Sequence, residues 1–354
     1  MPHSIHCHAF RDRSLQRGLS LVELMISITI GLLILSAMTT LFVNQSKTRA
    51  ELDKSNRMID NGRYALELLS ENLRLAGFYG ELDPSTIDLP IRANNLGNSA
   101  GGPCSTDPDD MSDAIRLHVQ GYNAATVAAA IASPPCGLTS ASLKGGSDIL
   151  VLRRADTSDP IPQATATDGI HYIQVSSCPL DTAATFMIEN AADEFEVLRP
   201  RNCTATSTAP YADLRRFIVQ TYFVSPNNSG SDGIPTLKRW ELDPVGSGAF
   251  VTTPLVEGIE YFQVEYGQDT DSDGVADSYV QTCADNTCWS NIVAMKLYVI
   301  ARNIEQTAGH SDAKTYDLGL AGTYTPSGND RKYKRHAYMQ AIRLVNPASR
   351  REAP

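Results

Sequence analysis

An uninterrupted apolar run near the start of the chain is its strongest pattern. Leu24 to Ser46 contains no charged residue, and at 1.5 Å per residue a helix over this run is about 35 Å long. That length is enough to cross roughly 30 Å of hydrocarbon, so the pattern predicts a membrane-spanning helix. A carboxylate inside such a span costs about 2.5–3.5 kcal/mol. Glu23, at the border of the run, is therefore expected to have a partner, and an amine is the natural one.

The helical pattern continues beyond the apolar run. Apolar residues recur at helical spacing over 59–73, and charged residues occupy the opposite face. Gly77 then stands where a helix usually ends. We expect one continuous helix from about residue 20 to residue 76, and the alternative is two helices with a break at 44–46 or at Gly62.

The rest of the chain has the sequence pattern of a β-rich domain. Short runs rich in β-branched and aromatic residues alternate with loops rich in Gly, Ser, Pro, Asn and Asp. The predicted strands cover residues 148–154, 217–224, 238–242, 259–266, 292–301 and 338–345. About 275 residues can enclose a sizeable core, as one decorated sheet or as two lobes.

The residues around the start of the apolar run resemble a known processing signal. The stretch from Gly18 to Glu23 reads G-L-S-L-V-E, which resembles the class III leader of type IV prepilins, usually G-F-T-L-I-E. The resemblance implies that a prepilin peptidase cleaves after Gly18 and methylates the new amine of Leu19, where Phe is usual. It also implies that Glu23 neutralises the N-terminus of a neighbouring subunit. A secretory signal or a plain membrane anchor is the alternative.

Two further stretches resemble the PilW family of minor pilins. They are residues 61–80, which end in R-L-A-G-F-Y-G, and residues 289–302. The resemblance implies an α+β, pilin-like fold, with a long N-terminal α-helix followed by a large β-rich globular domain. The expected parts are a cleaved leader (1–18), a transmembrane and filament-core helix (19–43), its amphipathic continuation (44–77) and a periplasmic or extracellular globular domain (78–354).

The same resemblance implies a function. The chain is expected to be a minor pilin that takes part in type IV pilus assembly, at or near the pilus tip. Its implied partners are other minor pilins, the major pilin, a PilY-type tip adhesin, the inner-membrane assembly platform and the prepilin peptidase. The alternatives are a minor pseudopilin of type II secretion and a single-pass, calcium-stabilised surface binding protein that never polymerises.

Charge and topology agree with this interpretation. The leader carries three arginines and one aspartate, a net of +2, which favours a cytoplasmic N-terminus and an exported C-terminal domain. Expected localisation is therefore the bacterial inner membrane, and then the pilus. Removal of the leader changes the formal charge from -10 to -12, since -10 minus 2 is -12. Such an acidic domain is a poor candidate for binding nucleic acid.

Six cysteines remain after Cys7 leaves with the leader, and an even number in an exported domain indicates disulfides. Fifteen connectivities are possible for six cysteines. We predict pairing between neighbours, because each pair brackets a loop-like stretch: Cys104 with Cys136, Cys178 with Cys203, and Cys283 with Cys288. A zinc site is disfavoured, because no C-x-x-C occurs and the histidines are scattered.

One acidic loop has the spacing of a calcium site. Residues 269–277 read D-T-D-S-D-G-V-A-D, which places oxygens at EF-hand positions 1, 3, 5 and 9, with glycine at position 6. Position 12 is Val280 in place of the bidentate Glu, so an acidic turn without metal is the alternative. The candidate ligands are Asp269, Asp271, Asp273, the carbonyl of Val275, and Asp277.

Catalytic motifs are missing from the sequence. It contains no G-x-S-x-G, no phosphate-binding glycine loop, no H-E-x-x-H and no dinucleotide fingerprint. We therefore expect a structural protein without enzymatic activity.

Overall fold

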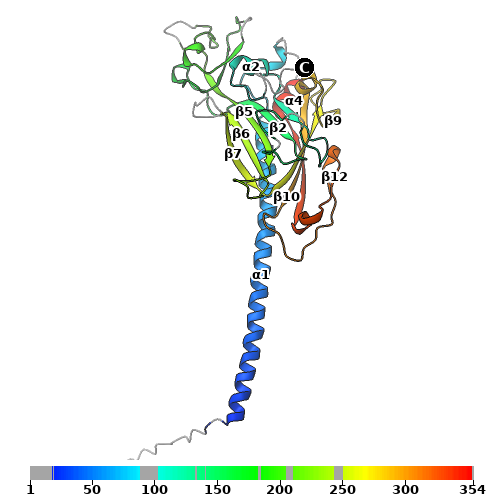
Figure 1. The fold of residues 1–354 in the computed structure, drawn as a ribbon. Helices are drawn as coiled ribbons and strands as arrows, with labels where there is room; N and C mark the ends of the chain where they lie inside the picture. The colour runs from blue at the N-terminus through cyan, green and yellow to red at the C-terminus, as the bar shows by residue number, and fades with distance from the viewer. Residues whose placement is uncertain are drawn as a thin grey trace, which may run out of the picture. The chain divides into compact units, whose positions relative to one another are not determined.

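The protein was analysed as a computed structural model, shown in Figure 1, that describes residues 18, 20–87, 103–131, 134–139, 141–181, 185–204, 210–242 and 250–352. It divides into two compact units, residues 1–53 and residues 54–354. The leader residues 1–17 and Leu19 lie outside the described residues.

Helices account for the start and the end of the described chain. They are α1 (Leu21–Arg74), α2 (Pro108–Asp113), α3 (Asn286–Ser290) and α4 (Val345–Glu352). α1 is a single helix of 54 residues, so the prediction of one continuous helix is confirmed and the alternative breaks are absent from it. The helix ends close to the expected position, with Gly77 at a φ of +69°.

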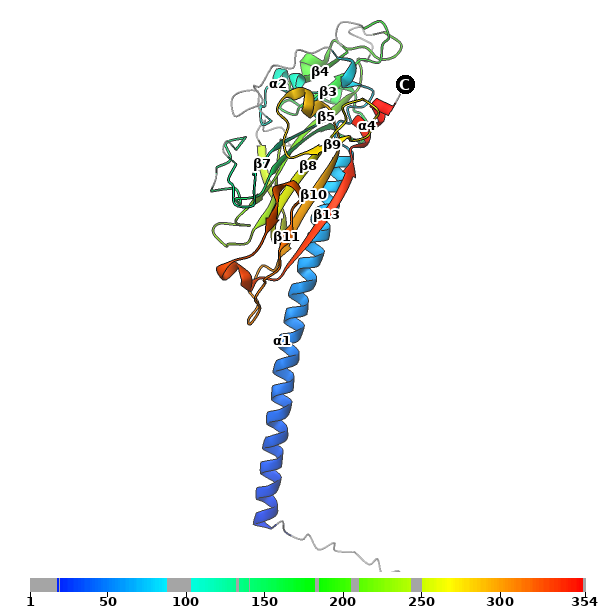
Figure 2. The same cartoon turned by 90° about the vertical axis from the view of Figure 1, so that its right-hand side faces the viewer.

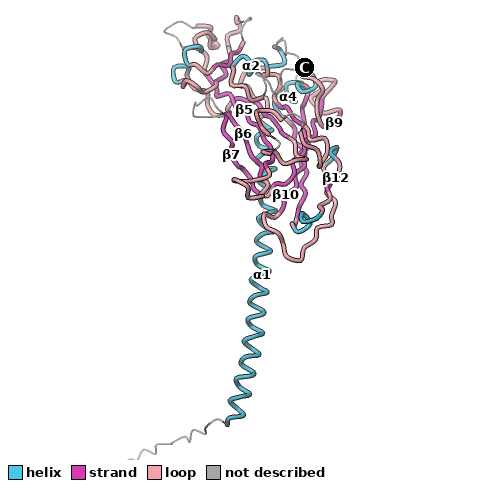
Figure 3. The backbone as a smooth tube through the Cα atoms, in the orientation of Figure 1, coloured by secondary structure: helices cyan, strands magenta, loops and turns pink. Residues whose placement is uncertain are grey.

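The remainder is β-rich, as predicted and as the colouring of Figure 3 shows. The strands are β1 (Val119–Tyr122), β2 (Ile149–Ala155), β3 (Tyr172–Val175), β4 (Phe186–Glu189), β5 (Leu214–Ser225), β6 (Thr236–Leu242), β7 (Phe250–Glu257), β8 (Ile259–Gln268), β9 (Ser278–Val280), β10 (Ile292–Arg302), β11 (Tyr316–Asp317), β12 (Thr323–Tyr324) and β13 (Arg335–Arg343). All six predicted strands are present, each with slightly different bounds.

The strands form three antiparallel sheets. The largest has seven strands, with the order β1-β2-β5-β3-β4, and β6 pairs with both β5 and β7. The second has the order β13-β10-β8-β9, and β11 with β12 forms a small two-stranded sheet. Neighbouring strands in sequence often pair directly, as β6 does with β7, whereas β13 returns to pair with β10 after a long excursion.

The second half of α1 is the centre of the main core. Leu66, Leu69 and Leu73 are buried on one face of the helix, in a cluster that also contains side chains from both larger sheets. On β10, alternate residues such as Leu297 and Val299 belong to the same cluster, as the two-residue period of a strand requires. The amphipathic pattern over 59–73 therefore identified the buried face of the helix.

Gly62 allows β13 to approach α1 closely, and the two elements lie side by side in Figure 2. A Cβ atom at this position would lie 2.2 Å from the ring of Tyr338. The Tyr338 hydroxyl donates a hydrogen bond of 3.1 Å to the carbonyl of Ile59. Gly62 is thus a packing position within the helix.

The C-terminal helix α4 satisfies carbonyls just beyond the end of α1. Arg350 donates 2.9 Å hydrogen bonds to the carbonyls of Gly77 and Leu82, and the Asn346 amide donates to the carbonyl of Ala76 at 3.2 Å. The Asn346 amide also donates to the carbonyl of Arg74, the last residue of α1, at 3.4 Å. The last carbonyls of a helix have no partner within the helix, so this contact stabilises its end. α4 therefore fixes the point at which α1 passes into the β-rich domain.

A buried carboxylate joins the two larger sheets. Asp148, just before β2, accepts hydrogen bonds from the backbone N–H of Ala124 at 2.8 Å and of Val264 on β8 at 2.9 Å. Burial raises the pKa of Asp148 to about 7, and these two hydrogen bonds only partly offset that effect. The carboxyl is therefore close to its titration point at neutral pH.

A buried imidazole makes a second contact between the two larger sheets, and its pKa is shifted in the opposite direction. His118 lies just before β1, and its Nε2 is 2.6 Å from the carbonyl oxygen of Ile292 on β10. Burial lowers the pKa of His118 to about 4. The ring is neutral at pH 7, where it is one of several contacts between β1 and the second sheet.

These two groups predict opposing contributions to stability between pH 8 and pH 5. The pKa of Asp148 is raised in the folded state, so its contribution is present at low pH and is lost as the pH rises through about 7. The pKa of His118 is lowered, so its contribution is present at neutral pH and is lost as the pH falls from about 6.5 toward 4. Because the two effects oppose each other, together they should change the free energy of unfolding of the wild-type protein only slightly over this pH range.

We expect Asp148→Asn to remove the first contribution. Relative to wild type, its free energy of unfolding should fall by about 2 kcal/mol as the pH is lowered from 8 to 5. Urea titrations of the full chain in detergent, followed by near-ultraviolet circular dichroism, measure this change, with His118→Gln as the variant expected to shift the profile in the other direction. Parallel profiles for Asp148→Asn and wild type would contradict the role given to Asp148.

Candidate functional site

The first part of α1 exposes an apolar surface along its whole length. From Leu21 to Val43 every large apolar side chain is exposed, and the helix is long and apolar enough to cross a membrane by length and composition. Hydroxyl side chains in this part of the helix donate hydrogen bonds to backbone carbonyls one turn earlier, as Thr29 does to Met25 at 2.6 Å. Such bonds leave fewer polar groups to be satisfied by the surroundings. The segment therefore presents an apolar face that lipid or other apolar helices can cover.

Glu23 lies in the first turn of α1, at the N-terminal end of this apolar surface. Its backbone N–H bonds to the hydroxyl of Ser20 at 3.2 Å, so Ser20 acts as the N-cap residue. The carboxylate of Glu23 is exposed, and Gly18 is exposed two residues before the cap. The carboxylate thus stands close in sequence to the expected cleavage point between Gly18 and Leu19.

The acidic loop brings together three of its predicted ligands. One carboxylate oxygen from each of Asp269, Asp271 and Asp273 lies within 4.8 Å of the other two, and this is the metal-compatible cluster among the described residues. Asp277 is not one of these three, and its Oδ2 accepts hydrogen bonds from the N–H of Thr270 at 2.7 Å and from the Thr270 hydroxyl at 2.6 Å. The arrangement could hold a metal ion through three carboxylates.

The loop is also held by its own hydrogen bonds. The buried carboxylate of Asp269 accepts from the N–H of Ser272 at 2.7 Å and of Gly274 at 3.0 Å. Gly274 has a φ of +82°, and a Cβ there would lie 2.6 Å from the carbonyl oxygen of Ala348. Only glycine combines that backbone conformation with so close an approach, as its EF-hand position predicted.

Arg351 of α4 provides a positive charge at the base of the loop. Its Nη1 lies 3.4 Å from Oδ2 of Asp269, and its Nη2 donates to the carbonyl of Ser290 at 3.2 Å and to Oδ1 of Asn291 at 2.5 Å. A metal ion would therefore share Asp269 with an arginine. This contact could not be predicted from the sequence, because Arg351 lies 82 positions away in a charged C-terminal stretch.

The two ends of the loop differ in their electrostatics. The pKa of Asp271 is above its ordinary value. The N–H of Asp273 lowers this pKa, but desolvation and the neighbouring carboxylates of Asp273, Asp277 and Asp269 together raise it by more. Hydrogen bonds from Thr270 hold the pKa of Asp277 below the ordinary value. Repulsion at Asp271 is the kind of cost that a bound cation offsets.

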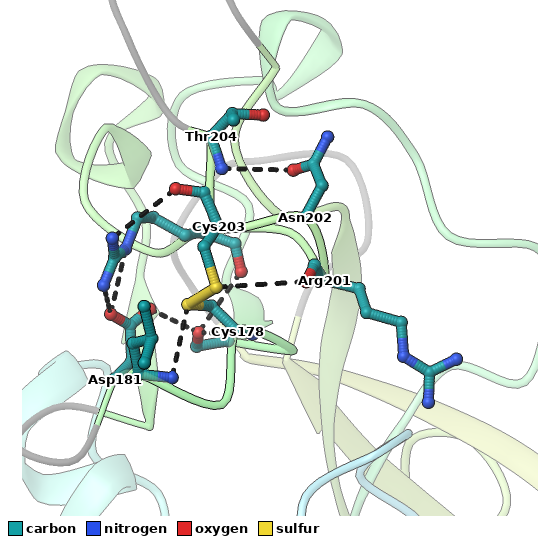
Figure 4. Close-up of a disulfide and its surroundings, with 9 residues drawn as sticks. Cys178, Asp181, Arg201, Asn202, Cys203 and Thr204 are labelled. Atoms are coloured by element: carbon teal, nitrogen blue, oxygen red, sulfur yellow. Dashed lines mark hydrogen bonds and ion pairs between the residues drawn. A yellow bond between two sulfur atoms is a disulfide. The ribbon is translucent and has the colours of Figure 1, made fainter.

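The three disulfides have the predicted pairing. They join Cys104 to Cys136, Cys178 to Cys203 and Cys283 to Cys288, with Cα–Cα distances of 5.3, 5.0 and 5.5 Å. Figure 4 shows the second, with Asp181 close to it. Asp181 accepts a 2.9 Å hydrogen bond from Nε of Arg199. The third joins Cys283, in the segment between β9 and α3, to Cys288 within α3, a few residues after the acidic loop.

Three of the described histidines, His118, His171 and His336, make contacts within the fold. His118 and His171 contact backbone carbonyl oxygens through their Nε2 atoms, and the ring of His336 packs edge-on against Tyr338 at 4.6 Å between centroids. In the part of the chain that the structure describes, none of them belongs to the metal-compatible cluster.

Comparisons with known proteins identify two parts of the chain. Residues 221–346 match the family described as type IV pilus-assembly protein W, PilW, and residues 13–39 match the prokaryotic N-terminal methylation motif. No curated protein matches the chain. Among solved structures, a type IV-like pilin from Thermus thermophilus is similar at 11% identity and a TM-score of 0.26, over 57% of this chain and 78% of that chain.

The two family matches fall on the segments that carry the apolar helix and the acidic loop. The match over residues 13–39 includes the beginning of α1, and the match over residues 221–346 runs from β5 to the start of α4. The chain is thus similar to the PilW family over residues 221–346, and it carries a prokaryotic N-terminal methylation motif at the start of its apolar helix.

Proposed function

We propose that this protein is a minor pilin that takes part in type IV pilus assembly, at or near the pilus tip. After cleavage between Gly18 and Leu19 and methylation of the new amine, residues 19–43 enter the filament core. The observation that carries the proposal is the exposed apolar surface of α1, interrupted by one carboxylate at its N-terminal end.

Glu23 has a defined part in this mechanism. An exposed carboxylate becomes costly when apolar helices pack around it, unless a cation is placed beside it. The amine at Leu19 of a neighbouring subunit is a cation that cleavage creates in every subunit. Pairing between this amine and Glu23 fixes the axial register of adjacent helices, and methylation keeps the charge on the nitrogen.

The partners follow from this assembly. Other minor pilins and the major pilin pack through their own apolar helices, while a PilY-type adhesin and the inner-membrane platform contact the complex before extension. The protein spans the inner membrane once before assembly, with the leader in the cytoplasm, as the arginines before Gly18 favour. Its role is structural, and it needs no catalytic group.

We expect Glu23→Ala to leave membrane insertion intact and to impair assembly. Incorporation into sheared pili should fall by about tenfold or more, because the loss of one charge pair in an apolar core exceeds 1.4 kcal/mol. Ser36→Ala, an exposed change in the same helix, is the matched control and should behave as wild type. Immunoblots of membrane and pilus fractions measure both, and normal piliation with Glu23→Ala would rule out the pairing.

We also propose that the acidic loop takes calcium. The favouring observation is the convergence of Asp269, Asp271 and Asp273 in the conformation that the loop already has. The backbone carbonyl of Val275 and water would complete the oxygen ligands, with Asp277 held by Thr270 outside the set. A bound ion would offset the repulsion between the carboxylates and stiffen the segment before Cys283.

Calcium is expected to bind with a dissociation constant of about 10⁻⁴ to 10⁻³ M. At ten times this constant it should stabilise the full chain by about 1.4 kcal/mol, since ligand binding to the folded state alone contributes RT ln(1 + [L]/Kd). Isothermal titration with calcium alone checks the affinity. Asp271→Asn should weaken binding by at least about tenfold, whereas the control Asp277→Asn should not. Absence of binding at millimolar calcium would refute the calcium proposal.

A further inference from the structure

An open groove lies next to the point where α1 passes into the β-rich domain. It has a volume of about 290 Å³, and its floor is formed by β3 and the start of β5, including Ile173, Val175 and Arg215. Ile173 and Arg215 are direct cross-strand partners, so they occupy the same position along the two strands. The segment from Tyr79 to Glu81 forms one wall.

Three prolines give the groove a rigid border. Pro160, Pro200 and Pro210 line it, and Tyr211 adds an aromatic side chain that is only partly buried. Prolines have fixed φ angles and no N–H group, so they leave an apolar border that changes little on binding. Pockets that enclose a whole small ligand usually exceed about 300 Å³. A groove of this size and openness is better matched to a few side chains of a larger partner.

The charges at the groove favour a cationic occupant. Glu81 and Asp213 line it and are exposed. Arg215 is the basic residue of the lining, and its Nη1 donates to the carbonyls of Asp156, at 3.1 Å, and Ser158. The lining thus carries two carboxylates and one guanidinium, and the guanidinium is already hydrogen-bonded to backbone carbonyls. The formal charge of -10 on the whole chain acts in the same direction.

The groove is lined by residues that follow the C-terminal end of α1. Lys54 is the first residue of α1 that belongs to the same compact unit as the groove. About 30 Å of helix separates Lys54 from Arg74 at 1.5 Å per residue. The groove therefore lies near the Arg74 end of this part of α1, and not near its Lys54 end.

We propose that this groove binds an extended segment of a partner protein, which places an apolar side chain against Val175 and Tyr211 and a Lys or Arg side chain between Glu81 and Asp213. The choice of a polypeptide over a small molecule rests on the proposed role in assembly. The apolar floor supplies affinity, and the paired carboxylates select the charge of the segment.

Binding of defined peptides to the full chain in detergent micelles tests this proposal. The probe is the fluorescent peptide Gly-Ser-Leu-Lys-Leu-Lys-Leu-Ser-Gly, and its counterpart carries Glu in place of both Lys residues. Fluorescence anisotropy should show saturable binding of the Lys peptide and at least tenfold weaker binding of the Glu peptide. Empty micelles give the background for both probes.

Variants separate the groove from general electrostatic attraction. Glu81→Lys with Asp213→Lys should weaken binding of the Lys peptide by about tenfold or more. Asp193→Lys with Glu194→Lys makes the same change of net charge on an exposed turn outside the groove, and should change binding by less than about threefold. If the first double variant loses its native near-ultraviolet spectrum, Glu81→Gln with Asp213→Asn replaces it.

Three results would overturn the proposal: no binding of the Lys peptide by the wild-type chain, equal binding of both peptides, or equal losses in the two double variants. Because the assay uses purified protein without filaments, its failure leaves the pilin function untouched. Conversely, normal pili made without this protein would refute the pilin role without affecting the peptide result.

Discussion

The burial of one face of α1 between strands of both larger sheets is the interaction on which the β-rich domain depends. An amphipathic helix of this length gains most of its stability from packing, since helical propensity alone is a weak force in water. Leu69 and Leu73 are fully buried, and β13 follows the helix closely because Gly62 leaves room for Tyr338. Changes along this face would therefore disturb several strands together.

Buried polar groups specify how the elements meet. Arg335 on β13 donates to both carboxylate oxygens of Glu260 on β8, at 2.5 and 3.1 Å, across the intervening strand β10. The same guanidinium lies 3.4 Å from Asp312 in the excursion between β10 and β13. Desolvation offsets much of the attraction in such a network. Its main effect is therefore to fix the register of β13 and the path of the excursion, in addition to the joints made by Asp148 and His118.

The sequence predicted those parts of the fold whose signal is local. Helical periodicity located α1, and clusters of β-branched and aromatic residues located β2, β5, β6, β8, β10 and β13. Shorter strands such as β3 and β4 carry four residues each, too few for a recognisable alternation. β7 reads F-V-T-T-P-L-V-E, and Pro254 in its middle argues against a central strand, but β7 is an edge strand, in which proline is tolerated.

The same distinction applies to the candidate sites: those with residues close together in sequence could be predicted, and those assembled by packing could not. The acidic loop could be found because its ligands are close in sequence, and the disulfide pairs could be guessed because each closes a short segment. Arg351 beneath Asp269 could not be foreseen, because that contact joins residues brought together only by the packing of α4. The groove beside Tyr79 was equally hidden, since its lining comes from five separate stretches of chain that carry no shared motif.

The central claim is that the apolar helix is processed as a pilin helix, and the mature N-terminus tests it most directly. Mass spectrometry of the protein from cells with and without their prepilin peptidase measures that terminus. The account predicts a chain that begins at N-methylated Leu19 only when the peptidase is present. An uncut chain, or one cut beyond Val43 by a signal peptidase, would contradict it and would leave a membrane-anchored or secreted binding domain.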